Sequence, residues 1–224
     1  MQGPIMELTT KTGLNLRMGP ISKDDLSSFV GPHAMHSLQA SRYLGRIAAP
    51  SIEDEEEWYE KMRTDGSSMS WGLFAGESDG HKLIGGTSLN RIQNNQMFRR
   101  ATSGILIFDQ DYWGKGIATA THAARTYFAF RELGLGVIYS KVFHTNEPSR
   151  KAIESVGYVL TGTNRCQGMH RGEWLHANDF ELINPDDWAW NAWWSGDQPT
   201  EDFLEARERT LRRLEWAEDN IRFT

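Results

Sequence analysis

The stretch DQDYWGKGIATATHAARTYFAFREL, from Asp109 to Leu133, joins a strand-like run to a long apolar helix through a glycine-rich turn. Gly114 and Gly116 flank Lys115 at the junction. Glycine is the default residue where the backbone needs a positive φ or a close approach, so one interpretation is a tight turn. The other is an anion cradle, in which unpaired N–H groups at a helix N-terminus face phosphates. The stretch alone leaves both interpretations open.

The composition describes one domain with an appendage. The chain has 224 residues, of which 39% are hydrophobic and 11% aromatic, enough for a packed core. Its net charge of −6 argues against general binding to nucleic acid or to an anionic membrane. Cys166 is the single cysteine, which excludes an intramolecular disulfide. The sequence shows neither a signal peptide nor a membrane-spanning run, so we expect a cytoplasmic protein without a nucleic-acid or membrane partner.

Hydrophobic periodicity and turn residues predict an alternation of strands and helices. The predicted strands cover residues 14–18, 70–76, 81–92, 99–108, 137–143, a segment from 158 onward, and 173–183. The predicted helices follow Ser22, Ser51, Gly116 and Asn146.

The character of the chain changes after Pro185, where a tryptophan-rich segment leads into a charged helix. We predict a domain over residues 12–188 and an appendage over 189–224. Leu204, Leu211, Leu214 and Ile221 are expected to form one apolar stripe on the last helix. Such a patch is too large to leave in water, so the tail packs either on the domain or on a second subunit, as in a homodimer.

The order of elements, together with four short motifs, resembles the GNAT superfamily of acyl-CoA-dependent N-acyltransferases. The similarity is greatest to its ribosomal-protein N-terminal alanine acetyltransferase branch (RimJ/RimL-like). The motifs are Trp113-Gly114-Lys115-Gly116-Ile117-Ala118-Thr119, Asn146-Glu147-Pro148-Ser149, Gly157-Tyr158 and Gly172-Glu173-Trp174. The resemblance implies an α+β GNAT fold, with a single mixed, mostly antiparallel, splayed sheet flanked by helices, followed here by the C-terminal helical appendage.

The resemblance also implies acetyl-CoA as co-substrate and no metal, with the diphosphate of CoA on residues 112–119. Lys115 is either a cation for the phosphates or a solvated lysine, and Trp113 either walls the cofactor channel or simply packs. In this fold the pantetheine arm lies between two splayed strands and pairs with the backbone of Leu106 to Phe108. The implied cofactor-binding residues are Leu106, Ile107, Phe108, Trp113, Gly114, Lys115, Gly116, Ile117, Ala118, Thr119, Asn146 and Ser149.

Asn146 and Ser149 fall within the first turn of a predicted helix and can face one point. On spacing alone, Asn146 is an N-cap and Ser149 a polar first-turn residue. The resemblance assigns them chemistry: Asn146 holds the pantetheine amide, and Ser149 protonates the leaving thiolate. Many superfamily members carry a tyrosine where this chain has Ile153, which removes the usual phenolic acid.

The acceptor amine must lose a proton, and the sequence leaves the base open. The branch often uses a glutamate where this chain has Gly168. His144 and His170 are the candidates that we name as catalytic, and each has an alternative role as a surface or strand histidine. His176, Glu173 and a water chain remain alternatives.

The predicted reaction is direct transfer of acetyl, in a ternary complex, to a primary amine of a peptide, protein, polyamine or amino sugar. The acidic run Glu53–Glu57 is either a solvated helix face or an attractor for a cationic acceptor. Two other functions stay open: a non-catalytic acyl-CoA sensor, and a docking module built on the tryptophan-rich tail.

Overall fold

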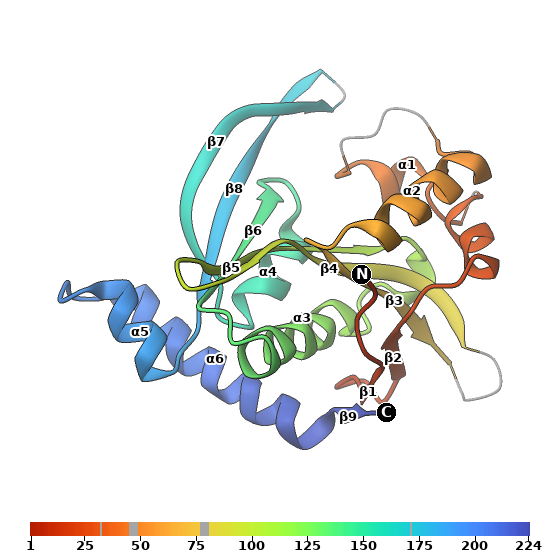
Figure 1. Cartoon of the computed structure of the whole chain (residues 1–224). Helices are drawn as coiled ribbons and strands as arrows, with labels where there is room; N and C mark the ends of the chain where they lie inside the picture. Colours follow the sequence, from red (N-terminus) through yellow and green to blue (C-terminus); the bar gives the residue numbers. More distant parts are fainter. Residues whose placement is uncertain (32, 45–48, 77–80, 171) are drawn as a thin grey trace. The chain divides into compact units, whose positions relative to one another are not determined.

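The computed structural model describes residues 1–31, 33–44, 49–76, 81–170 and 172–224, without the side chain of His170. Nine strands form one open mixed sheet in the order β7-β8-β6-β5-β4-β3-β2-β1-β9 (Figure 1). β5 (Arg99–Ile107) runs parallel to β6 (Val137–Phe143), from Arg100 beside Val137 to Ser103 beside Ser140. The pairs β1–β2, β1–β9, β2–β3, β3–β4, β6–β8 and β7–β8 are antiparallel. This is the α+β, mostly antiparallel fold that the sequence predicted.

The chain divides into two compact units, each of which is described by itself. Unit 1 comprises Met1–Asn90, Gly104–Ala120 and Ile221–Thr224, and unit 2 comprises Arg91–Ser103 and Thr121–Asn220. In the described part of the chain, no helix combines the length and the apolar composition that a membrane crossing requires.

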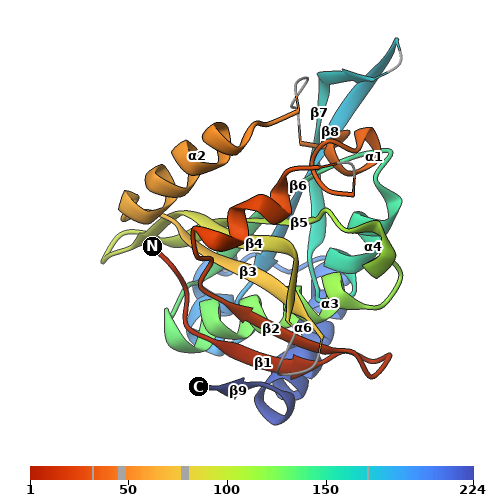
Figure 2. The same cartoon turned by 90° about the vertical axis from the view of Figure 1, so that its right-hand side faces the viewer.

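Unit 1 is built on antiparallel strands whose apolar residues alternate inward, as Leu16 and Met18 do. Its strands include β1 (Met6–Thr9), β2 (Asn15–Gly19), β3 (Met69–Ala75), most of β4 (Lys82–Asn94) and β9 (Arg222–Phe223). Its helices include η1 (Asp24–Phe29), α1 (Leu38–Ser41), α2 (Ile52–Thr64) and the short 3₁₀ helix η2 (Gln110–Tyr112). Figure 2 shows η1 and α2 on one side of these strands, where Phe29 packs on Phe108 and Trp58.

Local sequence explains the start of α2. The Ser51 side chain accepts a hydrogen bond from the Asp54 N–H, and the Asp54 carboxylate accepts one from the Ser51 N–H. This capping box satisfies two backbone donors at the helix start. The predicted cap at Ser22 differs: Ser22 donates to Asp25 through its N–H and its hydroxyl, and a short 3₁₀ helix follows.

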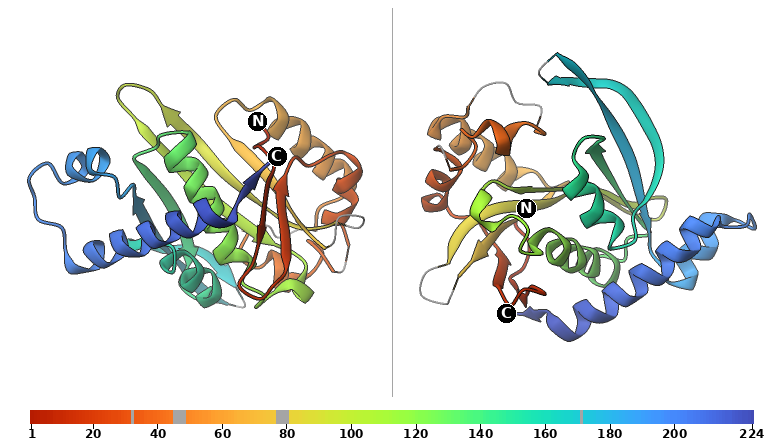
Figure 3. Two further views of the ribbon diagram at one scale, coloured as in Figure 1. Left: turned by 90° about the horizontal axis from the view of Figure 1, so that it is seen from below. Right: turned by 180° about the vertical axis from the view of Figure 1, so that it is seen from behind.

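Unit 2 contains most of α3 (Ile117–Tyr127), which continues as a π-helical turn, η3 (Phe128–Glu132). Then come β6, α4 (Glu147–Glu154), β7 (Val159–His170), β8 (Glu173–Ile183), α5 (Asp187–Trp194) and α6 (Glu201–Asn220). β7 and β8 form a long curved hairpin (Figures 1 and 3). Bulges interrupt its register after Leu160 and after Asn164, which explains its bend.

The last helix packs on unit 2 through small residues. The Thr210 hydroxyl donates to the Val156 carbonyl at 3.1 Å, and Arg213 Nε donates to the Ser155 carbonyl at 3.1 Å. Gly157 permits this approach, because a methyl group placed on it would lie 2.0 Å from Thr210 Oγ1. The end of α4 therefore needs a glycine for two reasons, its φ of +116° and the helix above it.

The predicted apolar stripe on this helix is partly wrong. Leu214 and Ile221, which directly follows α6, are buried, but Leu204 and Leu211 are 49% and 44% exposed. The buried face instead contains Ala206, Thr210 and Ala217. Small residues let two helices approach closely, so the packed stripe is narrower than leucine spacing alone indicated.

The sequence missed β1, β9 and α5. β9 pairs Arg222 and Phe223 with Glu7 and Met6 of β1, at opposite ends of the chain (Figure 3, left). Two-residue strands carry no periodic signal, so only the long-range pairing defines them.

Candidate functional site

The glycine-rich loop in unit 1 has the backbone geometry of an anion site. Gly114 and Gly116 have φ values of +75° and +76°, and α3 begins at Ile117. The first α-helical bond there is donated by the Ala120 N–H to the Gly116 carbonyl at 3.1 Å. The N–H groups just before it therefore point out of the helix start, where the helix dipole favours negative charge. This arrangement fits a diphosphate.

Two lysines near the loop, Lys115 within it and Lys82 at the start of β4, are held by neighbouring groups. Lys115 Nζ lies 4.9 Å from the centre of the Tyr112 ring, a cation–π contact. Lys82 Nζ lies 2.5 Å from Asp109 Oδ2. This hydrogen bond to the Asp109 carboxylate raises the pKa of Lys82. The Asp109 side chain also receives the Asp111 N–H at 3.1 Å, which fixes the turn before the glycines.

The end of β5 has fewer free backbone groups than the sequence suggested. The Phe108 N–H donates to the Ile84 carbonyl at 3.0 Å, and the Trp113 indole N–H donates to the Ile107 carbonyl at 2.9 Å. A methyl group on Gly85 would lie 2.2 Å from the Leu106 oxygen, so that carbonyl also faces β4. Successive residues of a strand point their N–H groups to opposite edges, which turns the Ile107 N–H away from β4. Among residues 106–108, it is the group best placed to pair with a pantetheine amide.

The first turn of α4, in unit 2, brings Asn146 and Ser149 together as predicted. Asn146 Oδ1 accepts the Ser149 N–H at 3.4 Å, and the Asn146 carbonyl accepts the Arg150 N–H at 3.0 Å. Asn146 is thus an N-cap, which leaves its amide NH₂ to donate elsewhere. In the described part of the chain, no hydrogen bond to the Ser149 hydroxyl is found, and Ser149 is partly exposed. Ile153, where a tyrosine is common, is a core residue.

His144 forms a pair with His176, with ring centres 5.0 Å apart. The His176 N–H lies 3.1 Å from His144 Nδ1, and the His176 carbonyl already accepts the His144 N–H at 2.8 Å. The Cys166 N–H in turn donates to His176 Nδ1 at 3.1 Å. A neutral imidazole that accepts at Nδ1 carries its proton on Nε2. His144 Nδ1 also lies 3.3 Å from the His176 carbonyl oxygen, so whether this nitrogen accepts or donates a hydrogen bond depends on the tautomer of His144.

The other base candidates lie on the β7–β8 hairpin. His170 pairs with Glu173 in the strand register, and the His170 side chain lies outside the described residues. Glu173 is exposed. At Gly168, where the branch often has a glutamate, a methyl group would meet the Phe143 ring at 3.6 Å. This is an ordinary van der Waals distance, so the backbone at Gly168 leaves room for a side chain beside Phe143.

A buried polar cluster in unit 2 was not predicted. Arg125 Nη2 donates to His122 Nδ1 at 2.7 Å, and the Tyr158 hydroxyl lies 3.0 Å from Ser103 Oγ. Burial, followed by the charge of Arg125, holds the pKa of His122 well below its usual value. Burial also lowers the pKa of Arg125, although Tyr158 opposes that shift. The spacing of His122 and Arg125 puts both on one helix face; the sequence indicated a largely apolar helix, but it did not single out these two polar residues.

The predicted site residues thus belong partly to unit 1 and partly to unit 2. Unit 1 holds Leu106, Ile107, Phe108 and the loop from Trp113 to Thr119, and unit 2 holds His144, Asn146 and Ser149. Among the residues that the structure describes, no group of histidine, cysteine and carboxylate side chains could hold a metal ion.

Comparison with known proteins identifies the family. Residues 15–159 match the family described as "Acetyltransferase (GNAT) domain". An uncharacterized N-acetyltransferase of Bacillus subtilis, YoaA, is 24% identical over 164 residues, which cover 73% of this chain and 84% of that protein.

Solved structures show the same fold. RimJ of Mycobacterium smegmatis, in complex with CoA-disulfide, matches with a TM-score of 0.71 at 16% identity, over 99% of this chain and 97% of that one. Spermidine N-acetyltransferase of Vibrio cholerae, in complex with CoA and spermine, matches with a TM-score of 0.63 at 24% identity, over 76% of this chain and 95% of that one. The family match spans the glycine loop, Asn146 and Ser149, so this chain belongs to the GNAT family of N-acetyltransferases, whose acetyl donor is acetyl-CoA.

Proposed function

We propose that this N-acetyltransferase moves acetyl directly from acetyl-CoA to a primary amine that is cationic when free. In the proposal, loop 112–119 binds the diphosphate of the donor, and Asn146 and Ser149 act at its thioester. The observation that carries the proposal is the loop itself, where two positive-φ glycines open a helix within the family match. The Ile107 N–H is the proposed backbone partner of the pantetheine arm.

Ser149 is proposed as the acid for the leaving group. As the C–N bond forms and the C–S bond breaks, the Ser149 hydroxyl gives its proton to the departing sulfur. It regains a proton from the amine nitrogen or from water, so the products are the amide and the free thiol. Asn146 supports this step by fixing the Ser149 backbone, because its side chain accepts the Ser149 N–H. The Asn146 NH₂ is proposed to donate to a pantetheine carbonyl.

The proton of the entering ammonium is proposed to leave through water rather than through His144. The supporting observation is that the backbone N–H and the carbonyl oxygen of His176 lie 3.1 Å and 3.3 Å from His144 Nδ1, so this nitrogen is engaged in either tautomer. His144→Asn should therefore keep the pH profile of kcat/KM, which would follow the free-amine fraction of the acceptor. If kcat/KM of this variant no longer rose with pH as it does in wild type, His144 would be the base.

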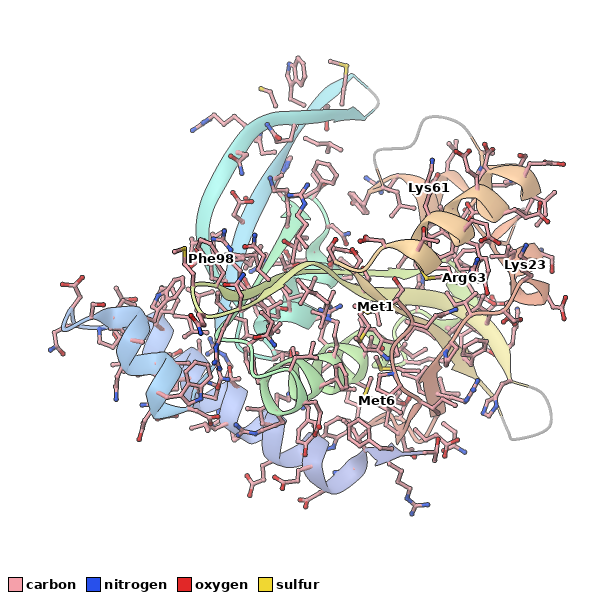
Figure 4. The ribbon with its side chains drawn as sticks, in the orientation of Figure 1. Met1, Met6, Lys23, Lys61, Arg63 and Phe98 are labelled. Atoms are coloured by element: carbon pink, nitrogen blue, oxygen red, sulfur yellow. The ribbon has the colours of Figure 1, made fainter. Side chains whose placement is uncertain are left out.

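The acidic helix α2 supports a cationic acceptor. It carries six carboxylates and two basic residues. Lys61 pairs with Glu57 at 2.7 Å, while Lys23 and Arg63 both pair with Glu60 at 3.0 Å (Figure 4). Glu55 is buried, which corrects the expectation of a wholly solvated run. Glu53 and Glu56 are exposed and form no ion pair among the described residues, so their charges can attract a cation.

A protein or peptide α-amine is proposed ahead of a polyamine. The fold match to RimJ extends over 99% of this chain, whereas the match to the spermidine enzyme covers 76%. Peptide α-amines and polyamines are both ammonium ions at neutral pH, so the same acidic residues would attract either acceptor. Rates measured with each acceptor decide which is preferred.

The test is release of free thiol from acetyl-CoA with a matched panel of peptides, polyamines, amino sugars and hydroxyl analogues. We expect amines alone to react, at rates that fall with added salt because exposed charges are screened beyond about 10 Å at 0.1 M. Glu53→Gln with Glu56→Gln should raise KM about threefold or more. The control, Glu201→Gln with Glu208→Gln, removes equal charge from exposed positions of α6. Turnover of hydroxyl compounds alone, or acceleration by salt, would contradict the proposal.

A further inference from the structure

The turn between β1 and β2 lies on the glycine loop of unit 1. The Thr12 hydroxyl donates to the Lys115 carbonyl at 2.9 Å, although the two residues are 103 positions apart. Within the turn, the Gly13 N–H donates to the Thr10 carbonyl at 2.9 Å, and the Leu14 N–H donates to Thr10 Oγ1 at 3.2 Å. The turn is therefore internally braced and tied to the loop by a specific bond.

This tie brings Lys11 over Gly116. A methyl group placed on Gly116 would lie 3.3 Å from Cγ of Lys11, 3.7 Å from its Cε and 3.9 Å from its Cδ. The aliphatic stem of Lys11 thus runs across the glycine that immediately precedes α3. Lys11 is exposed and forms no ion pair in the described part of the chain, so its ammonium is free to meet an anion.

The other lysines near the loop are engaged differently. Lys115 has its ammonium over the Tyr112 ring, and Lys82 is paired with Asp109. Lys11 is the lysine whose aliphatic stem lies next to Gly116, just before the start of α3. The cation suggested by the glycine motif and the cation seated on the helix start are therefore different residues.

We propose that Lys11, from the β1–β2 turn, supplies a cation to the phosphoryl groups of CoA, and that Thr12 positions it. The inference rests on the proposed placement of the CoA phosphates on loop 112–119. A lysine ammonium is a compact point charge on a flexible stem, suited to a phosphate whose exact orientation varies. The diphosphate and the 3′-phosphate share this chemistry, and the choice of ligand separates them.

The experiment measures Kd by calorimetry, without acceptor, for CoA, 3′-dephospho-CoA and phosphate-free pantetheine. Lys11→Met keeps most of the stem and removes the charge, and Lys11→Arg keeps the charge. The control is Lys61→Met, an exposed lysine on α2 in the same unit, paired with Glu57 (Figure 4). Thr12→Val removes the hydroxyl that donates to the Lys115 carbonyl, and so tests whether this bond positions Lys11. Melting temperatures without ligand verify that each variant folds.

We expect Lys11→Met to weaken CoA binding about three- to tenfold, a range suited to one exposed charge-assisted contact. Lys11→Arg and Lys61→Met should stay near wild type, Thr12→Val should fall between, and pantetheine binding should not change. An effect that disappears with 3′-dephospho-CoA assigns the 3′-phosphate, and one that persists assigns the diphosphate.

Equal Kd values for Lys11→Met and Lys61→Met would overturn the proposal, as would an equal loss for CoA and pantetheine. The proposed function fails separately. If wild type binds CoA but transfers acetyl to no amine, the acceptor assignment is wrong while the Lys11 result still stands.

Discussion

Arg125 donates a hydrogen bond of 2.7 Å to Nδ1 of His122, and both side chains are almost completely buried in unit 2. Because Nδ1 accepts, the proton of the neutral imidazole lies on Nε2, and this buried nitrogen has no hydrogen-bond partner among the described residues. A second proton would put two positive charges side by side in the protein interior. The surroundings of His122 therefore favour its neutral form.

Acid should destabilise the protein through His122. Its folded pKa is well below 6.5, so below about pH 6.5 the unfolded chain binds a proton that the folded chain refuses. Stability from this group is complete above pH 6.5 and falls by about 1.4 kcal/mol per pH unit below it, until the folded pKa is reached. Urea unfolding of His122→Asn should lack this component. Exposed His33→Asn is the control, and parallel stability curves for wild type and His122→Asn would contradict the account.

Gly114→Ala and Gly116→Ala should separate backbone strain from contact. Both glycines have a positive φ, which costs other residues about 1–2 kcal/mol, so both variants should lose similar stability. Only at Gly116 would the new methyl group meet Lys11, at 3.3 Å, whereas nothing lies within 4 Å at Gly114. We expect calorimetry to show a larger loss of CoA affinity for Gly116→Ala. Wild-type CoA affinity for Gly116→Ala would mean that the start of α3 does not bind the phosphates.

Ser149→Ala should lower turnover and spare binding. A general acid contributes on the order of 10²–10⁴ in rate, so kcat should drop by about that factor while the Kd for CoA changes little. Ser155→Ala removes a hydroxyl from the other end of α4, where it donates to the Ala152 carbonyl at 2.7 Å, and serves as the control. A near-normal kcat for Ser149→Ala would reduce Ser149 to a capping-turn residue.

Leu214→Ala and Leu211→Ala test how α6 is packed. Leu214 is 2% exposed, and truncating a buried leucine costs about 2–5 kcal/mol. Leu211 is 44% exposed on the same helix, so its truncation should cost less than about 1 kcal/mol. Thermal unfolding of both variants measures the difference. A similar melting temperature for the two would show that α6 does not pack through this face in solution.

Much of the fold could be predicted because its signals are local. The predicted strands at 137–143 and 173–183 coincide with β6 and β8, and Ser51 caps α2 as expected. The Gly114–Gly116 junction opens α3, and Asn146 caps α4 over Ser149. Each of these features follows from periodicity or from contacts within one helical turn. The loop and α4 could therefore be singled out before any coordinates.

What the sequence could not supply is the set of contacts between distant segments. By itself it determined most of the strands and helices, the glycine loop and the membership in a family of acetyl-CoA enzymes. Only the tertiary structure decided that Lys11 lies on Gly116, that Arg222 and Phe223 pair with β1, and that α6 buries Thr210 rather than Leu211. It also decided that the Phe108 N–H is taken by Ile84. Local rules fix which way a side chain leaves its own helix or strand, whereas its partner depends on how the whole chain packs, and no period in the sequence records that.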